Sequence, residues 1–248
     1  MIRYLFIITM LLFVGEFSNA QTFSIEAFDG TIQSIDVVPD YDNDVLKILS
    51  SKDTLYIANV IGVEEKVVIL DKHFLKIVYN VTAGSDIGLE QILLLCVNNN
   101  KLCQSLHVTS LSTYDVETVY DKRADSLKLF DEHGIYELKL TLNGNSKINY
   151  KLNIGIHDEE RSKRNLLTNY NYNKQVALNF DTSQNIFYSF IKNVDGYFSV
   201  YDPKMSKVNK RYITGKFPFI ILGRIDYCYI NGDWYEMGDN KLAKYSYR

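Results

Sequence analysis

The sequence predicts a mostly-β protein with very little helix. Short apolar segments recur along the chain and are separated by Asn, Asp and Gly. The 248 residues include 19 Tyr and 13 Phe but only 3 Pro, a composition that favours strands. Helical periodicity is almost absent; the best helix candidate is Asp44–Ser50, with Asp44 as its cap. We expect an antiparallel sandwich or barrel-like N-terminal unit followed by a smaller antiparallel β meander.

The first twenty residues have the three parts of a secretory signal peptide. Arg3 supplies a positive charge, Tyr4 to Val14 is apolar apart from Thr9, and Ser18-Asn19-Ala20 is a small-x-small end. The apolar run is shorter than the roughly 20 residues that a membrane helix needs. The alternative is a buried N-terminal strand or a membrane anchor. We therefore expect residues 1–20 to be removed near Ala20, and the mature chain to be secreted or periplasmic with no transmembrane segment.

Charge divides the rest of the chain. Residues 21–160 contain 12 Lys and Arg against 22 Asp and Glu, whereas residues 161–216 contain 10 against 3. We predict an acidic antiparallel β domain over 21–160, a polar linker or long loop over 161–175, and a basic, Tyr-rich β meander over 176–248. Two lobes of one fold remain an alternative. The net charge of −3 gives no reason to expect a nucleic-acid partner.

Two cysteines are expected to face each other across a hairpin. If Asn99-Asn100 forms a two-residue loop, Cys96 lies directly opposite Cys103, within the range of Cα separations that a disulfide bridges. An oxidising compartment permits that bond, and two buried thiols are the alternative. The same register places Leu93 opposite Leu106. The strand before the loop is apolar on both faces, which predicts a central, fully covered strand.

Catalytic signatures are absent or weak. The chain contains neither G-x-G-x-x-G nor G-x-x-x-x-G-K-[ST], and the residues around Ser85 do not match a nucleophile elbow. Asp40, Asp42 and Asp44 are a weak calcium candidate, because they match the first positions of a calcium loop but lack its Gly and Glu. A solvated acidic turn is the alternative. No other cofactor is expected, and the chain is more readily read as a non-enzyme.

The signals for interaction are better. Cations next to aromatic rings suit an anionic glycan, a lipid head group or an acidic protein face. Such a group is formed by Lys204, Lys207, Lys210, Arg211, Tyr212 and Lys216. A solvated loop with lysines that protect an edge strand is the alternative. Trp234 and Tyr235 belong to a second aromatic cluster, which forms either an exposed binding row or the core of the small β unit.

These observations favour a non-catalytic binding or scaffolding component of the cell envelope, with another envelope protein or a glycan as its partner. A hydrolase of extracellular polymers with an unidentified carboxylate pair is the first alternative. An inhibitor or immunity-type protein that blocks a partner enzyme is the second. A cleft with two carboxylates would favour the hydrolase, and an exposed aromatic row without such a cleft would favour binding.

Overall fold

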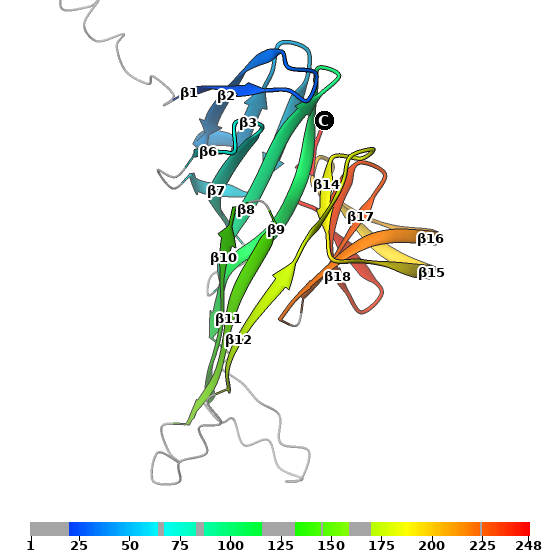
Figure 1. Cartoon of the computed structure of the whole chain (residues 1–248). Helices are drawn as coiled ribbons and strands as arrows, with labels where there is room; N and C mark the ends of the chain where they lie inside the picture. The colour runs from blue at the N-terminus through cyan, green and yellow to red at the C-terminus, as the bar shows by residue number, and fades with distance from the viewer. Residues whose placement is uncertain are drawn as a thin grey trace, which may run out of the picture.

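The computed structural model describes residues 20–63, 67–82, 87–115, 132–144, 146–158, 170–223 and 225–248. The described chain is nearly all strand, as predicted, and its strands form two packed sheets and a small closed barrel (Figure 1). The helical content of this part is a single 3-10 turn, η1 (Tyr41–Asn43). Residues 1–19, which carry most of the predicted leader, lie outside the described residues. None of the described residues forms a helix with the length and hydropathy that a membrane crossing requires.

The first sheet is a four-strand meander completed by the last strand of the chain. Its order is β1-β2-β3-β4-β20 and all pairs are antiparallel. The C-terminal residues Ser246 and Tyr247 pair with Ile57 and Tyr56 of β4. The strands are β1 (Gln21–Glu26), β2 (Ile32–Asp40), β3 (Val45–Leu49), β4 (Thr54–Ala58) and β20 (Ser246–Tyr247).

The helix expected over Asp44–Ser50 is wrong, because strand β3 occupies this segment. Leu46 and Ile48 are fully buried while their neighbours are half-buried, which is the period of two of a strand. Asp44 ends the 3-10 turn with a φ of 51° instead of capping a helix. The segment is too short to distinguish the two periods by its apolar residues alone.

The second sheet is the central layer of the molecule. Its order is β12-β11-β10-β9-β8-β7-β5, with β6 also paired to β7. The first sheet packs on one face of β7–β9, and the barrel and the hairpin β13–β14 pack on the other. The strands are β5 (Val60–Val63), β6 (Val68–Leu70), β7 (Phe74–Thr82), β8 (Ile87–Asn98), β9 (Lys101–Asp115), β10 (Glu132–Asn143), β11 (Lys147–Asp158), β12 (Tyr170–Ala177), β13 (Asn179–Asp181) and β14 (Ile186–Tyr188).

Strand β8 is covered on both faces, as its sequence predicts. Leu93 and Leu95 point into the core shared with the first sheet, whereas Leu94 and Cys96 point into the core shared with the barrel. All four side chains are fully buried. Alternation along one apolar strand therefore supplies two separate cores.

The hairpin β8–β9 confirms the predicted turn but not the whole predicted register. Asn99 and Asn100 both have positive φ values, and Cys96 pairs with Cys103. Leu106 pairs with Leu94 instead of Leu93, because a β-bulge adds one residue to β9 between the Leu95 and Leu94 pairs. The bulge shifts every later pair, so Leu93 lies opposite His107.

The C-terminal meander closes into a five-stranded barrel. Successive strands are antiparallel, so the first and the fifth run in the same direction and close the barrel through a parallel pairing of β15 with β19. Gly215, with a φ of +143°, lies where β16 passes from its pairing with β15 alone toward β17. The strands are β15 (Phe190–Asp202), β16 (Lys207–Leu222), β17 (Ile225–Ile230), β18 (Asp233–Gly238) and β19 (Lys241–Ala243).

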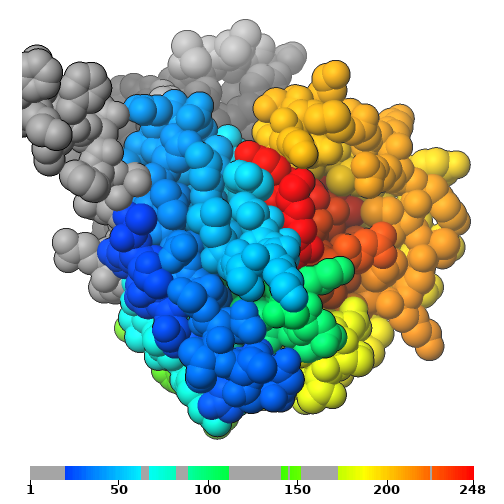
Figure 2. All heavy atoms as spheres, turned by 90° about the horizontal axis from the view of Figure 1, so that it is seen from above, coloured from blue at the N-terminus to red at the C-terminus, as the bar shows by residue number. Residues whose placement is uncertain are grey.

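The central sheet and the barrel share a core. The predicted linker over 161–175 ends inside strand β12. Residues 170–175 belong to β12, which pairs with β11, while residues 161–169 lie outside the described residues. The Tyr-Asn-Tyr-Asn run at 170–173 resembles a polar loop in composition but alternates as a strand does. The C-terminal segment lies between the N-terminal sheet and the barrel (Figure 2).

Candidate functional site

Strands β15 and β16 form a long two-stranded ribbon that projects from the side of the barrel (Figure 1). The two strands pair from Phe190↔Phe219 to Asp202↔Lys207. One side of the ribbon carries Val194, Val200 and Phe217, which fill the barrel interior. The other side therefore faces outward, by the alternation of strand residues.

The outward side of the ribbon, called here the ribbon face, carries four apolar or aromatic side chains and two lysines, next to the exposed Asp195. Where β16 reaches Ile220 and Leu222, this side packs on the central sheet. Nearer the turn that joins the two strands no described core covers this side, and most of its side chains are exposed. We define the ribbon face by Ile191, Tyr197, Val208, Lys210, Tyr212 and Lys216.

A pair of exposed tyrosines lies at the middle of the ribbon face. Tyr197 and Tyr212 are cross-strand partners, with ring centroids 5.0 Å apart and exposures of 70% and 56%. The Tyr212 hydroxyl donates to the Asp195 carboxylate, which raises the pKa of Tyr212. Rings that pack against each other in solvent are a ready contact surface, because little further ordering is needed on binding.

Most of the predicted cations lie on the same strand as Tyr212. Lys207, Lys210, Arg211 and Lys216 are all exposed on β16. Because strand residues alternate, Lys210 and Lys216 project on the ribbon face, and Lys207 and Arg211 project on the other side of the strand. Lys204 lies in the turn that joins the strands, where its ammonium donates to the carbonyl of Arg248 at 3.3 Å. Five of the predicted binding residues thus remain together, with Lys204 at their margin.

Trp234 and Tyr235 are placed differently from the cations. Both are buried, with exposures of 2% and 8%. Trp234 packs in the core between the barrel and the central sheet, and Tyr235 packs in the barrel interior. The structure therefore matches the core alternative for these rings, and the exposed aromatic pair is Tyr197 and Tyr212. Tyr197 was not singled out from the sequence. Its only signal is its spacing of two residues from Asp195 and from Ser199, which puts it on the same face of a strand as these polar residues.

A buried polar cluster joins the three layers at Gln104. The Gln104 side-chain oxygen accepts from His107 Nδ1 at 3.1 Å and from the Ser246 hydroxyl at 3.0 Å. Its amide donates to Asp233 at 3.1 Å, and Trp234 Nε1 donates to its backbone carbonyl. Because an amide oxygen only accepts, His107 carries its proton on Nδ1. We call these five residues the Gln104 junction.

The Gln104 junction connects three strands of the fold, and its histidine is not accessible to solvent. His107 is fully buried and its Nε2 is hydrogen-bonded to the Tyr79 hydroxyl. Desolvation lowers the pKa of His107 to about 3, so the ring is neutral at physiological pH. The hydrogen bonds link β9, β18 and β20, and they tie the barrel and the C-terminus to the central sheet.

The structure does not gather the calcium candidates into a site. Asp40 forms an ion pair with Lys47 at 2.6 Å and accepts a hydrogen bond from Asn43, which lower its pKa. Asp42 and Asp44 are exposed. Across the described residues, no group of three or more His, Cys, Asp or Glu could hold a metal ion. The three carboxylates resemble the solvated acidic turn that the sequence left as an alternative.

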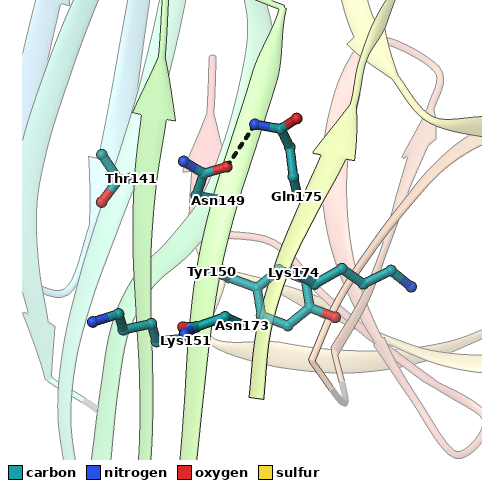
Figure 3. Close-up of a pocket in the computed structure, with 7 residues that line it drawn as sticks. All are labelled: Thr141, Asn149, Tyr150, Lys151, Asn173, Lys174 and Gln175. Atoms are coloured by element: carbon teal, nitrogen blue, oxygen red, sulfur yellow. Dashed lines mark hydrogen bonds between the residues drawn. The ribbon is translucent and has the colours of Figure 1, made fainter. Parts of the chain in front are cut away.

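A second surface feature, called here the polar dish, lies on strands β10–β12 (Figure 3). It is a depression of about 540 Å³ without a carboxylate in its lining. Gln175 donates to Asn149 at 3.0 Å, which fixes two facing amides. Thr141 and Asn149 are paired, and so are Lys151 and Asn173. The dish is lined by Thr141, Asn149, Tyr150, Lys151, Asn173, Lys174 and Gln175.

The most buried carboxyl with a shifted pKa is not part of such a depression. Desolvation raises the pKa of Glu236 on β18, and its hydrogen-bond partner is the Tyr245 hydroxyl at 3.2 Å. This is a carboxyl–phenol pair and not the carboxylate pair that glycoside hydrolysis needs.

Comparison with known proteins adds no relative. No family model matches the chain, and no curated protein or solved structure is similar enough to be matched to it.

Proposed function

We propose that this chain is an exported, non-catalytic binding protein that acts at the cell envelope, and that it engages an acidic partner protein through the ribbon face. The observation that carries the proposal is the exposed pair Tyr197–Tyr212 with Lys210 and Lys216 on the same outward side. Such a mixture of aromatic rings and long cations is typical of contact surfaces between proteins.

The apolar content of the ribbon face favours a protein over a glycan as its ligand. Ile191 and Val208 are 57% and 64% exposed near the two ends of this face. Aliphatic side chains gain free energy when apolar partner atoms cover them, and a sugar hydroxyl offers less of that surface. The lysines between them select for acidic partners and steer the encounter.

Site-specific crosslinking in the native host tests this proposal. A photo-reactive amino acid replaces Tyr212 in one variant and Tyr41 in a matched control, because Tyr41 is 52% exposed but lies in the acidic turn of the N-terminal sheet. We expect one partner protein to be crosslinked from position 212 and not from position 41. Equal crosslinking from both positions, or none from 212, overturns the proposal.

The same cells test export. The mature protein is expected outside the cytoplasm with Gln21 as its first residue. Mass spectrometry of the N-terminal peptide from each cell fraction measures this directly. A full-length chain that retains Met1 and stays in the cytoplasm contradicts the exported state.

A second candidate function follows from the polar dish. Its amides, hydroxyls and lysines offer hydrogen bonds to a hydroxyl-rich ligand, and a glycan is the ligand class that this chemistry fits. Titration calorimetry with envelope oligosaccharides measures it. Asn149→Ala and Gln175→Ala should each weaken binding, while Gln33→Ala on β2 should not. Unchanged binding in both dish variants assigns the glycan to another site.

A further inference from the structure

One edge of the ribbon lacks a partner strand along most of its length among the described residues. Strand β16 pairs with β15 along Lys207–Phe219 through one edge, but it pairs with β17 only from Phe219 to Leu222 through the other. The second edge is therefore free from Lys207 to Phe217. These eleven residues extend roughly 35 Å at the usual rise of a strand. Backbone N–H and C=O groups along such an edge are a template for another strand.

The charged side chains of the strand that forms this free edge are all positive. Strand β16 carries Lys207, Lys210, Arg211 and Lys216 and contains no Asp or Glu. Alternation distributes these cations over both sides of the strand, so that an added strand would meet positive charge above and below its plane. The ribbon face adds an apolar contact at Tyr212 next to the same edge.

The charge pattern decides which strand can pair there. Two copies of β16 placed edge to edge would bring four cations against four cations, and like charges directly opposite each other are destabilising. The lysines and arginine therefore disfavour self-association through this edge. They leave it open to a strand whose side chains are acidic.

We propose that the free edge of β16 accepts one β-strand from an extended, acidic segment of the partner protein. The main-chain hydrogen bonds would supply the alignment, and carboxylates on both faces of the added strand would pair with the cations of β16. This proposal rests on the proposed function, because it names how the acidic partner binds and which part of that partner does so.

The competing explanation is that the cations only prevent other strands from pairing with this edge. Charged side chains on an edge strand commonly prevent aggregation. If the cations only prevent pairing, the edge binds no added strand. If the proposal is right, the edge binds an acidic strand and does not bind a basic one. The two explanations therefore predict different results with one set of peptides.

The test uses the mature chain, residues 21–248, and an eleven-residue synthetic peptide that repeats Glu-Glu-Thr-Val, which places carboxylates on both faces of a strand. Hydrogen exchange followed by mass spectrometry reports protection of each strand. We expect slower exchange over residues 207–217 and no change over β12, which is also an outer strand of its sheet but carries a single lysine. A peptide with Lys in place of Glu should give no protection.

Two controls separate backbone pairing from charge attraction. N-methylation of alternate peptide residues removes main-chain donors and leaves the charges, so it should abolish protection. The variant Lys210→Glu should weaken binding of the unmodified peptide by about tenfold, while Lys52→Glu, at an exposed position between β3 and β4, should leave its affinity unchanged. Equal binding of the N-methylated peptide overturns strand addition.

The outcomes distinguish this proposal from the proposed function. If position 212 crosslinks a partner but no acidic peptide protects residues 207–217, strand addition is wrong and the ribbon face binds through side chains alone. If neither result is obtained, both proposals fail. A dimer of the mature chain with residues 207–217 protected, measured by light scattering without peptide, also overturns the proposal, because the occupant is then a second copy.

Discussion

The central sheet and the ribbon are both built from long strands, but they differ in how far the edges of those strands are paired and their faces are buried. Strand β8 is hydrogen-bonded on both edges and buried on both faces, whereas β16 has a free edge and an exposed face along Lys207–Phe217. The central sheet thus satisfies its backbone and side chains within the chain. The ribbon leaves both incomplete, which is why we assign stability to the first region and recognition to the second.

The largest expected effect contrasts the two regions by truncation of one side chain in each. Leu93→Ala removes a fully buried side chain between β8 and the first sheet. We expect it to lower the free energy of unfolding by about 3 kcal/mol. Ile191→Ala, at a position 57% exposed on the ribbon face, should change it by less than about 0.5 kcal/mol. Urea unfolding measures both, and equal losses would contradict the contrast.

The next effect concerns the cysteines at the end of the central hairpin. Both are thiols in the structure and are cross-strand partners, so the predicted disulfide remains a prediction. Cys96 is the buried member and Ser105 donates to its sulfur, while its interaction with the Cys103 sulfur and its burial raise its pKa. The Cys96 thiol and the nearby Arg248 lower the pKa of Cys103 to about 7, so Cys103 is the more readily ionised thiol.

We expect mild oxidation to join Cys96 to Cys103 and to raise the free energy of unfolding by about 2 kcal/mol, the range for a short loop. Peptide mapping without reductant identifies the bond, and Cys103→Ser is the control that should not respond. A bond to Cys228 instead would show that the hairpin register is not what limits the pairing.

Over a single pH unit, the smallest expected effect on the free energy of unfolding comes from the pH dependence of the Gln104 junction. Burial lowers the pKa of His107 to about 3, whereas an unfolded histidine titrates near 6.5. Between these values only the unfolded chain takes up the proton, so the free energy of unfolding should fall by about 1.4 kcal/mol for each unit from pH 6.5 down to 3.

Urea unfolding at several pH values measures this slope. The variant His107→Gln should lose the contribution of this group, and His73→Gln, outside the junction, should keep it. The ribbon face contains no histidine, so peptide or partner binding at the ribbon should not follow the same slope. If binding and stability fall together, the two regions are coupled.

The sequence predicted what depends on local pattern and missed what depends on distant packing. Two asparagines sufficed for the turn at 99–100, because few other residues adopt positive φ values so readily. The bulge in β9 has no such signature, since the extra residue is accommodated by tertiary contacts. The helix expected over 44–50 failed for the same reason: burial of Leu46 and Ile48 depends on the opposing sheet.

The candidate site divides in the same way. A run of cations is visible in the sequence at 204–216, and the structure leaves four of them exposed on one strand. Trp234 and Tyr235 could not be assigned to surface or core, because that choice depends on distant packing. The partner of Trp234 is the carbonyl of Gln104, 130 residues away, and Tyr235 is buried by the other strands of the barrel. The free edge of β16 could not be foreseen, because it follows from how few residues β17 pairs.

The pairing of β20 with β4 has a consequence for the order in which the molecule is made. Ser246 lies opposite Ile57, so the N-terminal sheet is complete only when β20, which follows the whole barrel in the sequence, has been made. A chain that leaves a ribosome or an export channel from its N-terminus would carry an unfinished sheet until synthesis or transport reaches β20. A chain truncated before Ser246 would leave the edge of β4 unpaired, although the other described strands had already been made.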